Sequence, residues 1–327
     1  MSAQKPTVTS ATIERYANVF RRLFVGAETH SGLKDPFDII DWMIADTVRL
    51  KPTRGKSTFR QYKAAIMYSL GAIIPNEKRS PAQKARLVSA RERMASESST
   101  GGLRKPIRTS AKKSRSVGES DFEVMRTHLL DRAGQDYWAK AALSAMYVLH
   151  LSGLRPGELS TVHLFEPEPG MFFMRVVNAK STNGRGNGDN RTLEFRGLAA
   201  DEATQLRAWP FLLEEFSREL LPLVAIARIS KYFGRATAKA LPKRAKHVTL
   251  YSFRHQFTAD CKRSGVSESD RAAMLGHGSN ATANKHYGRC VAGKTGVKAK
   301  ADPAESAKVR HKARRFPGRG SGPAPAK

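Results

Sequence analysis

The chain has 327 residues, with 57 lysines and arginines against 29 aspartates and glutamates, a formal net charge of +28 at pH 7 and a pI of about 10.5. An excess of this size favours a polyanionic partner, because neutralising phosphates releases counterions and supplies affinity that does not depend on sequence. Ribosomal-type and histone-like proteins share this composition. A polybasic membrane-surface protein is disfavoured, since no amphipathic anchor or lipidation motif accompanies the charge.

The two cysteines, Cys261 and Cys290, exclude a disulfide framework and favour a reducing compartment. The residues after Met1 lack the apolar core of a signal peptide. The longest apolar stretches, 141–154 and 220–229, are each interrupted by a histidine or an arginine and are too short to span a bilayer. We therefore expect a cytoplasmic protein that does not enter the membrane.

Residues 1–98 are predicted to be helical. Apolar residues recur at helical spacing over 13–24 and 59–70, a further apolar segment covers 37–47, and a charged helix over 82–96 follows Pro75 and Pro81. We interpret this region as a small four-helix bundle with basic faces. The basic residues of those faces are Arg60, Lys63, Arg86, Arg91 and Arg93.

Two segments have the composition of a linker and of a tail. Residues 99–118 are rich in Ser, Thr, Gly, Lys and Arg, which predicts a basic linker that does not pack but suits a nucleic-acid backbone. Residues 293–327 hold ten basic and two acidic side chains among many Ala, Gly and Pro. We expect the region 292–327 to be largely disordered and to tune affinity or assembly rather than to supply chemistry.

The region between them, 119–291, is predicted to be a second domain that combines helices with a short β-segment. Tyr137–Leu151 is an apolar helix closed by Gly153, and Pro156 stands where a proline opens a helix. The alternating segment Met171–Val177 and a returning strand, Arg191–Phe195, form a β-hairpin around a Gly- and Asn-rich loop. The fold class is therefore mainly α with a small β-hairpin or sheet (α+β).

Arg155 is the first residue with a potential role in phosphate chemistry. It precedes Pro156, and Glu158 follows three residues later. In one interpretation Glu158 is only the partner of a helix cap. In the other, Arg155 presents its guanidinium to a phosphate at a helix N-terminus, where backbone N–H groups also favour anions.

A second group of polar residues lies near the end of the predicted domain. Arg254 falls in a first helical turn, with Ser252 as the predicted N-cap and Gly265 as the stop. The segment Leu275-Gly276-His277 ends the next helix, and Tyr287 follows ten residues later. Singly, such a histidine or tyrosine is ordinarily a surface or packing residue, so only their combination carries information.

The order Arg-x-x-Glu-Leu, a lysine-bearing hairpin, Arg-His, Leu-Gly-His and Tyr resembles the catalytic domain of the tyrosine recombinases, the phage-integrase family. The resemblance covers roughly residues 115–290, and the helices of residues 1–98 suit the core-binding, DNA-clamping domain that precedes it in that family. Each motif is short, but the motifs follow one another in the order and spacing of that family, and they lie at the ends of helices.

The resemblance implies a role for each matching position. Arg155 and Arg254 would hold the phosphate, with Glu158 steadying the first arginine, and His277 would hydrogen-bond the scissile phosphate. Lys180 matches the hairpin lysine that protonates the departing 5′-oxygen, although Arg185 and Arg191 share this hairpin. Tyr287 matches the nucleophile.

Tyr251 departs from the family pattern, which most often has histidine three residues before the second arginine. A phenol can hydrogen-bond a phosphate oxygen, but with an ordinary pKa near 10 it is a poor proton acceptor at neutral pH. The family pattern therefore does not show which group accepts the proton of the nucleophilic phenol.

The resemblance implies a site-specific recombinase or integrase, of a mobile element or chromosome, that cleaves and rejoins double-stranded DNA through a 3′-phosphotyrosine. It also implies a tetramer on two DNA sites, close to the bacterial nucleoid, with no metal, ATP or other cofactor. Cys261, His277 and Cys290 do not have the spacing of metal ligands. The rival interpretations are a type IB topoisomerase, which shares the chemistry, and a basic DNA-binding protein that has lost catalysis.

Overall fold

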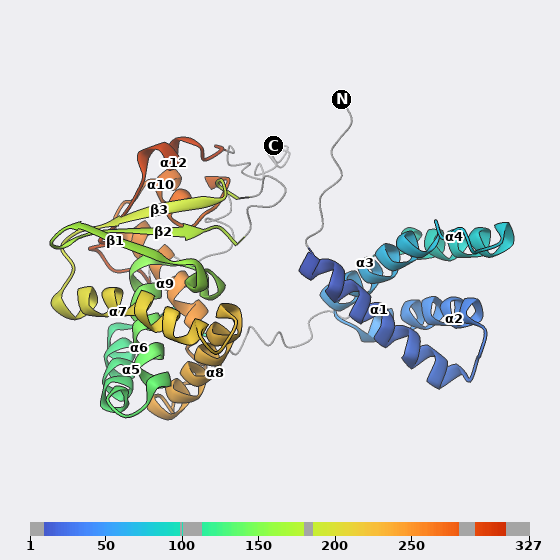
Figure 1. Ribbon diagram of the computed structural model, residues 1–327, viewed down its shortest axis with the longest axis horizontal. Helices are drawn as coiled ribbons and strands as arrows, with labels where there is room; N and C mark the ends of the chain where they lie inside the picture. Colours follow the sequence, from blue (N-terminus) through green and yellow to red (C-terminus); the bar gives the residue numbers. More distant parts are fainter. Residues whose placement is uncertain (1–9, 99, 101–112, 180–185, 281–291, 312–327) are drawn as a thin grey trace, which may run out of the picture. The chain divides into compact units, whose positions relative to one another are not determined.

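The computed structural model describes residues 10–98, 100, 113–179, 186–280 and 292–311 (Figure 1). The chain divides into two compact units, residues 1–108 and 109–327, so the division falls inside the predicted basic linker. The end of that linker belongs to the second unit. The Ser114 N–H donates to the carbonyl of His247 at 2.8 Å, and Val117 is buried in the core of this unit.

The first unit is a bundle of helices, as the apolar periodicity predicts. Helix starts carry the expected signals: Asp35 accepts hydrogen bonds from two backbone N–H groups, and Ser80 and Gln83 form a reciprocal capping box. Ile39, Phe59 and other apolar residues of the facing sides form one buried core. The helices are α1 (Ser10–Ser31), α2 (Pro36–Arg49), α3 (Lys56–Ile73) and α4 (Pro81–Ser96), with a 3₁₀ turn at Lys51–Thr53.

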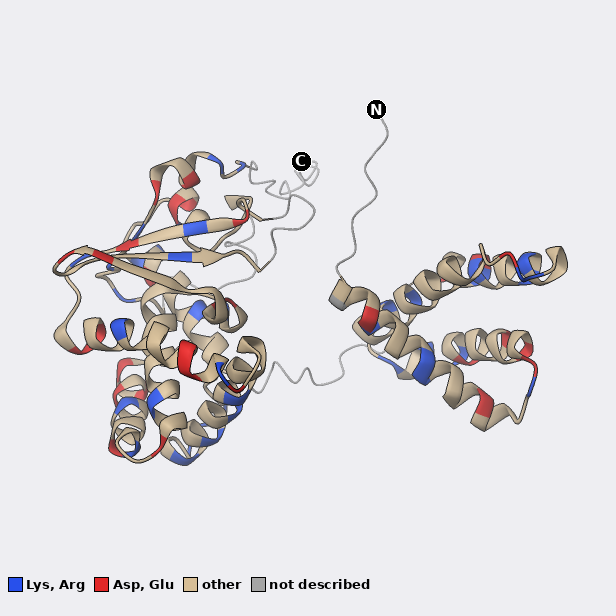
Figure 2. Ribbon diagram, viewed as in Figure 1, with Lys and Arg blue, Asp and Glu red and all other residues tan. Residues whose placement is uncertain are grey.

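Basic and acidic residues occur together on the helices of this bundle (Figure 2), and several of the basic side chains pair within it. Arg86 of α4 donates to Asp38 at 2.5 Å and to Asp41 at 2.7 Å, and Arg93 also pairs with Asp41. Lys63 of α3 donates to two backbone carbonyls at the end of α4. These side chains tie the helices together, so the charge of this unit is partly neutralised on the α2–α4 side.

The second unit combines helices with one small sheet, which confirms the predicted fold class. Helix α6 is buried along nearly its whole length and contacts α5, α7, α8 and α9. It begins at the N-cap Asp136 and ends at Gly153, whose φ of 63° reverses the chain. The helices are α5 (Glu119–Ala133), α6 (Tyr137–Ser152), α7 (Ala200–Ser217), α8 (Pro222–Ala240), α9 (Leu250–Arg263), α10 (Glu268–Met274) and α12 (Pro303–Ala307).

The sheet is antiparallel throughout, in the order β1-β2-β3-β4. The predicted hairpin is confirmed as β2 (Met171–Val177) and β3 (Asn190–Phe195), with alternate residues buried. Strands β1 (His163–Glu168) and β4 (Ala299–Ala301) extend it on either side and were not predicted from the sequence. In Figure 1, α10 and α12 lie next to β3, and α10 contacts β3, β4 and α12.

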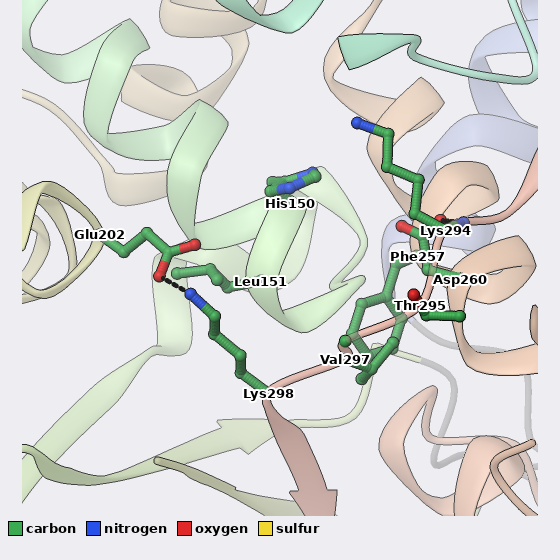
Figure 3. A pocket seen from close by; sticks show the side chains of 10 residues that line it. His150, Leu151, Glu202, Phe257, Asp260, Lys294, Thr295, Val297 and Lys298 are labelled. Atoms are coloured by element: carbon green, nitrogen blue, oxygen red, sulfur yellow. Dashed lines mark hydrogen bonds and ion pairs between the residues drawn. The ribbon is translucent and has the colours of Figure 1, made fainter. Parts of the chain in front are cut away.

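The chain after residue 292 packs on this unit, which corrects the prediction of a disordered tail for residues 292–311. Gln256 donates to the carbonyl of Ala292 at 2.8 Å, and Asp260 accepts from the Lys294 N–H at 2.7 Å. The Lys298 ammonium lies 2.5 Å from a carboxylate oxygen of Glu202 (Figure 3). The cavity under this segment measures only about 90 Å³.

Strand β4 and α12 complete the docking of this C-terminal segment. Ala299 pairs with Phe195 of β3, and Val309 is buried against Ala272 and Ala273 of α10. Small apolar residues suffice here because β4 gains backbone hydrogen bonds along β3. Strand β4 and α12 were not predicted, because the composition of this segment is typical of a disordered region. Residues 312–327 lie outside the described part of the chain.

Candidate active site

Arg155 and Glu158 form the first part of the site, just after α6. The chain turns at Gly153 and enters a 3₁₀ segment, Pro156–Thr161, rather than the α-helix that Pro156 predicts. Glu158 accepts from the Arg155 backbone N–H at 2.8 Å and from its guanidinium at 2.6 Å. Glu158 therefore serves both as the cap partner and as the ion-pair partner of Arg155, whose side chain is 13% exposed.

Arg254 lies near the start of α9, but it is the fifth residue rather than in the first turn, because the helix begins three residues earlier than predicted. Its N-cap is Thr249, and the predicted cap Ser252 is instead the third helical residue, whose hydroxyl oxygen accepts a hydrogen bond from the Thr249 backbone N–H at 3.0 Å. The side chain of Arg254 has no exposed surface. It donates to the carbonyls of Gly153 and Leu275, both at 2.8 Å.

His277 lies beside Arg254, with its Nε2 atom 2.9 Å from Arg254 Nη2. A guanidinium only donates, so His277 Nε2 accepts this hydrogen bond and the proton of the neutral ring is on Nδ1. Burial, followed by the charges of Arg254 and Arg155, lowers the pKa of His277 to about 2. His277 is therefore a neutral imidazole at physiological pH. Its turn follows Gly276, which ends α10 with a φ of 65°, as predicted.

Glu158 is the carboxylate at the centre of this cluster. Its two oxygens lie 2.6 Å from Arg155, 2.7 Å from Arg191 and 4.0 Å from Arg254. Burial by itself raises the pKa of a carboxyl group, but Arg191, Arg254 and Arg155 outweigh it and hold the pKa of Glu158 at about 2. The carboxylate is therefore charged throughout the physiological range.

Arg191 is the member of this cluster that sequence reasoning assigned differently. The sequence leaves Arg191 open as an alternative to Lys180 in the hairpin. The structure buries it completely, with its donors on Met274, Asn178 and Glu158. One signal was available: Arg191 shares the strand face of Leu193 and Phe195, where alternation predicts an apolar residue.

Tyr251 is the second residue of α9, three residues before Arg254, and is 38% exposed. Its ring lies 5.5 Å from that of His255, one helical turn later. Burial, followed by the charges of Arg115 and Arg254, lowers the pKa of His255 to about 4, so this imidazole is neutral at pH 7. Lys180 and Tyr287 lie outside the described residues.

The structure thus brings Arg155, Glu158, Arg254 and His277 into one cluster from three separate segments. With Arg191, three guanidiniums and a neutral imidazole surround a single carboxylate, which makes the site strongly electropositive. Within the described ranges, no group of three His, Cys, Asp or Glu side chains has a metal-binding arrangement. None of the described helices is both long and apolar enough to cross a membrane.

No family profile and no curated protein matches this sequence. Solved structures are similar in fold. A lambda integrase fragment in a dimer bound to a COC′ core site shares 16% identity, with a TM-score of 0.50 over 85% of this chain and 88% of that chain.

Two further structures are less similar. The XerH site-specific recombinase bound to difH shares 12% identity at a TM-score of 0.42, over 87% of this chain and 94% of that one. The XerA recombinase shares 15% identity at a TM-score of 0.38, over 85% and 92%. The lambda integrase match, together with the helical bundle and the α+β unit, shows that this chain has the fold of the tyrosine recombinases.

Proposed function

We propose that the chain is a site-specific tyrosine recombinase that cleaves and rejoins double-stranded DNA through a 3′-phosphotyrosine intermediate. The observation that carries this proposal is the convergence of Arg155, Arg254 and His277 around Glu158. A structural ion pair needs one arginine for one carboxylate, whereas a second guanidinium with a neutral histidine suits a phosphodiester. The net charge of +28 supports DNA as the partner.

In the proposed reaction Tyr287 releases its phenolic proton to solvent, and its oxygen attacks the scissile phosphorus. A P–O bond to the tyrosine forms as the P–O5′ bond breaks, and Lys180 supplies the proton that leaves with the 5′-hydroxyl. The reverse attack by a 5′-hydroxyl reseals the strand, so the phosphodiester energy is conserved in the covalent link without ATP.

The cluster supplies charge stabilisation in this reaction. Negative charge on the pentacoordinate transition state is met by Arg155, Arg254 and a donated hydrogen bond from His277. Donors held in place before the reaction stabilise such charge most effectively, because they need no reorganisation. The contacts of Arg254 to two backbone carbonyls support such a fixed position.

The resemblance to the family further supports a tetramer on two DNA sites, associated with the bacterial nucleoid. The helical unit of residues 1–98 and the basic segment 99–118 would contact the duplex in addition to the catalytic unit. Sequence preference would then come from groove contacts, whereas the basic residues supply affinity.

The experiment uses a pool of random-sequence duplexes, each with a nick in one strand, and collects protein–DNA adducts that resist SDS. A nick near the cleavage point lets the short 5′-hydroxyl fragment leave, so the covalent intermediate accumulates. We expect adducts with the wild-type chain and none with Tyr287→Phe, whose affinity for the pool should be unchanged because only one oxygen is lost.

The sequences recovered from the adducts separate the rival functions. A defined core sequence that also undergoes strand exchange between two duplexes supports the recombinase. Adducts without sequence preference, together with relaxation of supercoiled plasmid, would identify a topoisomerase. A protein that binds DNA and forms no adduct would be a non-catalytic DNA-binding protein.

A further inference from the structure

Arg191 occupies a position where the strand pattern requires an apolar residue. In β3 it alternates with Leu193 and Phe195 on the buried face, and its side chain is 0% exposed. Removing a guanidinium from water is costly unless every donor is paired and a counter-charge is near. A leucine would fill such a position without this cost, so the contacts of Arg191 need an explanation beyond packing.

Those contacts reach three different segments of the cluster. Arg191 Nε donates to the carbonyl of Met274 at 2.8 Å, its Nη1 to the side-chain oxygen of Asn178, and its Nη2 to Glu158 at 2.7 Å. Met274 is the last residue of α10, immediately before the turn that carries His277. The three acceptors are far apart in sequence, and Arg191 joins them at one point.

Asn178 connects Arg191 with the base of the hairpin loop. Its amide nitrogen donates to the carbonyls of Asn187 at 3.2 Å and Gly188 at 2.9 Å, which closes the loop between β2 and β3. The next residue, Ala179, donates its N–H to Glu158 at 3.3 Å. Lys180, the proposed proton donor, follows directly in the sequence.

The close fit of Gly276 shows how tightly the turn before His277 packs on this pair. A Cβ atom at Gly276 would lie 2.4 Å from Asn178 Oδ1 and 2.8 Å from Arg191 Nη1. The glycine therefore permits direct contact between the turn and the Arg191–Asn178 pair. We therefore expect a shift of Arg191 to move the backbone that carries His277.

We propose that Arg191 is a positioning residue of the active site, which holds Glu158, the base of the hairpin loop and the turn of His277 in one fixed arrangement. This inference rests on the proposed function. Arg191 is fully buried and acts through its neighbours rather than on DNA. Its loss should therefore lower the rate of the chemical step and leave DNA affinity unchanged.

The charges around Glu158 give a reason why the loss would be large. Arg155, Arg191 and Arg254 all face this carboxylate, and His277 lies next to Arg254. With Arg191 gone, the Glu158 oxygen that it binds keeps the Arg155 backbone N–H but loses one guanidinium, and can draw in Arg254, now 4.0 Å away. A guanidinium that closes on Glu158 has fewer donors directed at a phosphate, so the site loses part of its charge stabilisation.

The test compares Arg191→Met and Arg191→Lys with the wild-type chain, using a nicked duplex that carries a core sequence recovered as adduct. Single-turnover adduct formation at saturating DNA gives the rate of cleavage, and equilibrium binding to the same duplex gives affinity. We expect Arg191→Met to cleave on the order of 100-fold more slowly, the scale of loss when reacting groups are misplaced by about 1 Å, with affinity within about twofold of the wild type.

Arg191→Lys provides the graded comparison and remains informative if Arg191→Met does not fold. One ammonium can pair with Glu158 but cannot bridge Met274 and Asn178 at the same time, because it lacks the planar fork of arginine. We expect a loss on the order of tenfold, between the wild type and Arg191→Met. Thermal unfolding of each variant is recorded to show that it is folded at the assay temperature.

Arg196→Met is the matched control. Arg196 follows β3 and pairs with Glu194, but its side chain is 61% exposed. We expect wild-type cleavage from this variant. A wild-type cleavage rate in Arg191→Lys, equal losses of cleavage and affinity in either Arg191 variant, or the same loss in Arg196→Met would each overturn the inference. Failure of the wild-type chain itself to form adduct would count against the proposed function instead.

Discussion

Arg155 and Arg254 flank the same carboxylate but differ in what else they support. The Arg155 side chain pairs with Glu158 and keeps some exposed surface. Arg254 is fully buried and satisfies the carbonyls of Gly153 and Leu275. The two arginines have matching roles in the proposed chemistry, whereas only Arg254 also joins α6, α9 and the turn after α10.

We therefore predict that Arg155→Ala and Arg254→Ala lower cleavage alike but differ in stability. Each should slow cleavage by about 100-fold or more, since one fixed donor is lost. Arg254→Ala should also lower the free energy of unfolding, by about 1–3 kcal/mol for each buried carbonyl left without a donor. Urea unfolding and adduct formation measure the two effects. Equal stability of the two variants would contradict the assigned contacts.

The second prediction concerns Tyr251, which takes the place of a histidine common in the family. In Tyr251→His, an imidazole with an ordinary pKa near 6.5 accepts a proton at neutral pH far more readily than a phenol does. We expect cleavage to be retained, and to rise as the pH increases through about 6.5. Adduct formation between pH 5.5 and 8.5 measures this. A variant that binds DNA but never cleaves would show that the site depends on the phenol.

The third prediction concerns the pH dependence of stability. Burial lowers the pKa of His150 and of His255 to about 4, and that of His277 to about 2. The unfolded chain binds protons at these residues below about pH 6.5 while the folded chain does not, so stability falls as the pH drops from there. Glu305, whose pKa is raised to about 6, acts in the opposite direction and offsets part of this loss of stability.

His150→Phe tests this argument away from the catalytic cluster. The ring of His150 packs 4.6 Å from that of Phe122 and 6.2 Å from that of Phe253, so a phenyl ring suits the surroundings. We expect this variant to lose less stability than the wild type between pH 7 and pH 5. The comparison is made by urea unfolding at each pH. An unchanged slope would mean that His150 is protonated in the folded chain.

At the level of elements, glycines decide where helices end and how closely turns approach. Gly265 and Gly276 both follow a helix and both have positive φ, at 72° and 65°. Their surroundings differ: a Cβ at Gly265 would meet no atom within 4 Å, whereas a Cβ at Gly276 would overlap Asn178 and Arg191. Alanine substitutions at Gly265 and Gly276 therefore distinguish the cost of backbone strain alone from the cost of strain together with steric overlap.

The fourth prediction follows from that pair. Gly265→Ala should cost about 1–2 kcal/mol, the strain of an alanine in the left-handed region. Gly276→Ala should cost at least about 1–3 kcal/mol more, because the buried Asn178–Arg191 pair must shift. Denaturant unfolding compares the two variants. A similar cost for both would show that the cluster yields easily around Gly276.

The sheet shows how composition conceals an element. Strands β2 and β3 have alternating apolar residues and were predicted, whereas β4 is the three residues Ala299–Ala301 in a stretch of Ala, Lys and Gly. Its pairing depends on the exposed edge of β3, which is a property of the folded sheet rather than of the segment. The same edge interaction turns part of a tail that composition predicts as disordered into a part of the domain.

At the scale of the whole molecule, the C-terminal segment divides into two regions with different expected effects. Residues 292–311 contact α9, α10 and β3, whereas residues 312–327 add five further basic side chains: Lys312, Arg314, Arg315, Arg319 and Lys327. The expectation that residues 292–327 tune only affinity or assembly is therefore revised for a truncation after Ala292. That truncation removes the partner of β3 and the burial of Val309.

The fifth prediction compares two truncated chains. A chain ending at His311 should keep the thermal stability and the trapped cleavage of the full chain, and bind DNA more weakly mainly at low salt, since only phosphate contacts are lost. A chain ending at Ala292 should be less stable and cleave more slowly, because the Glu305 contact to the Thr192 N–H at 2.9 Å is lost with β4. Equal behaviour of the two chains would contradict a structural role for residues 293–311.

Local pattern alone determined much of this protein. Helical periodicity and caps predicted the bundle of α1–α4, the apolar α6 with its terminal Gly153, and the β2–β3 hairpin, because each depends on neighbours in the sequence. The short motifs around Arg155, Arg254 and His277 indicated the fold of the tyrosine recombinases, which the structural similarity confirms.

Tertiary structure decided what depends on residues far apart in the chain. The sequence does not show that Arg254 spans Gly153 and Leu275, that β4 pairs with β3, or that Arg86 and Lys63 are used inside the bundle. It also presents Arg191 as one more basic residue of a hairpin. Only folding places it beside Glu158, since a buried charge is stable only where the rest of the chain supplies its partners.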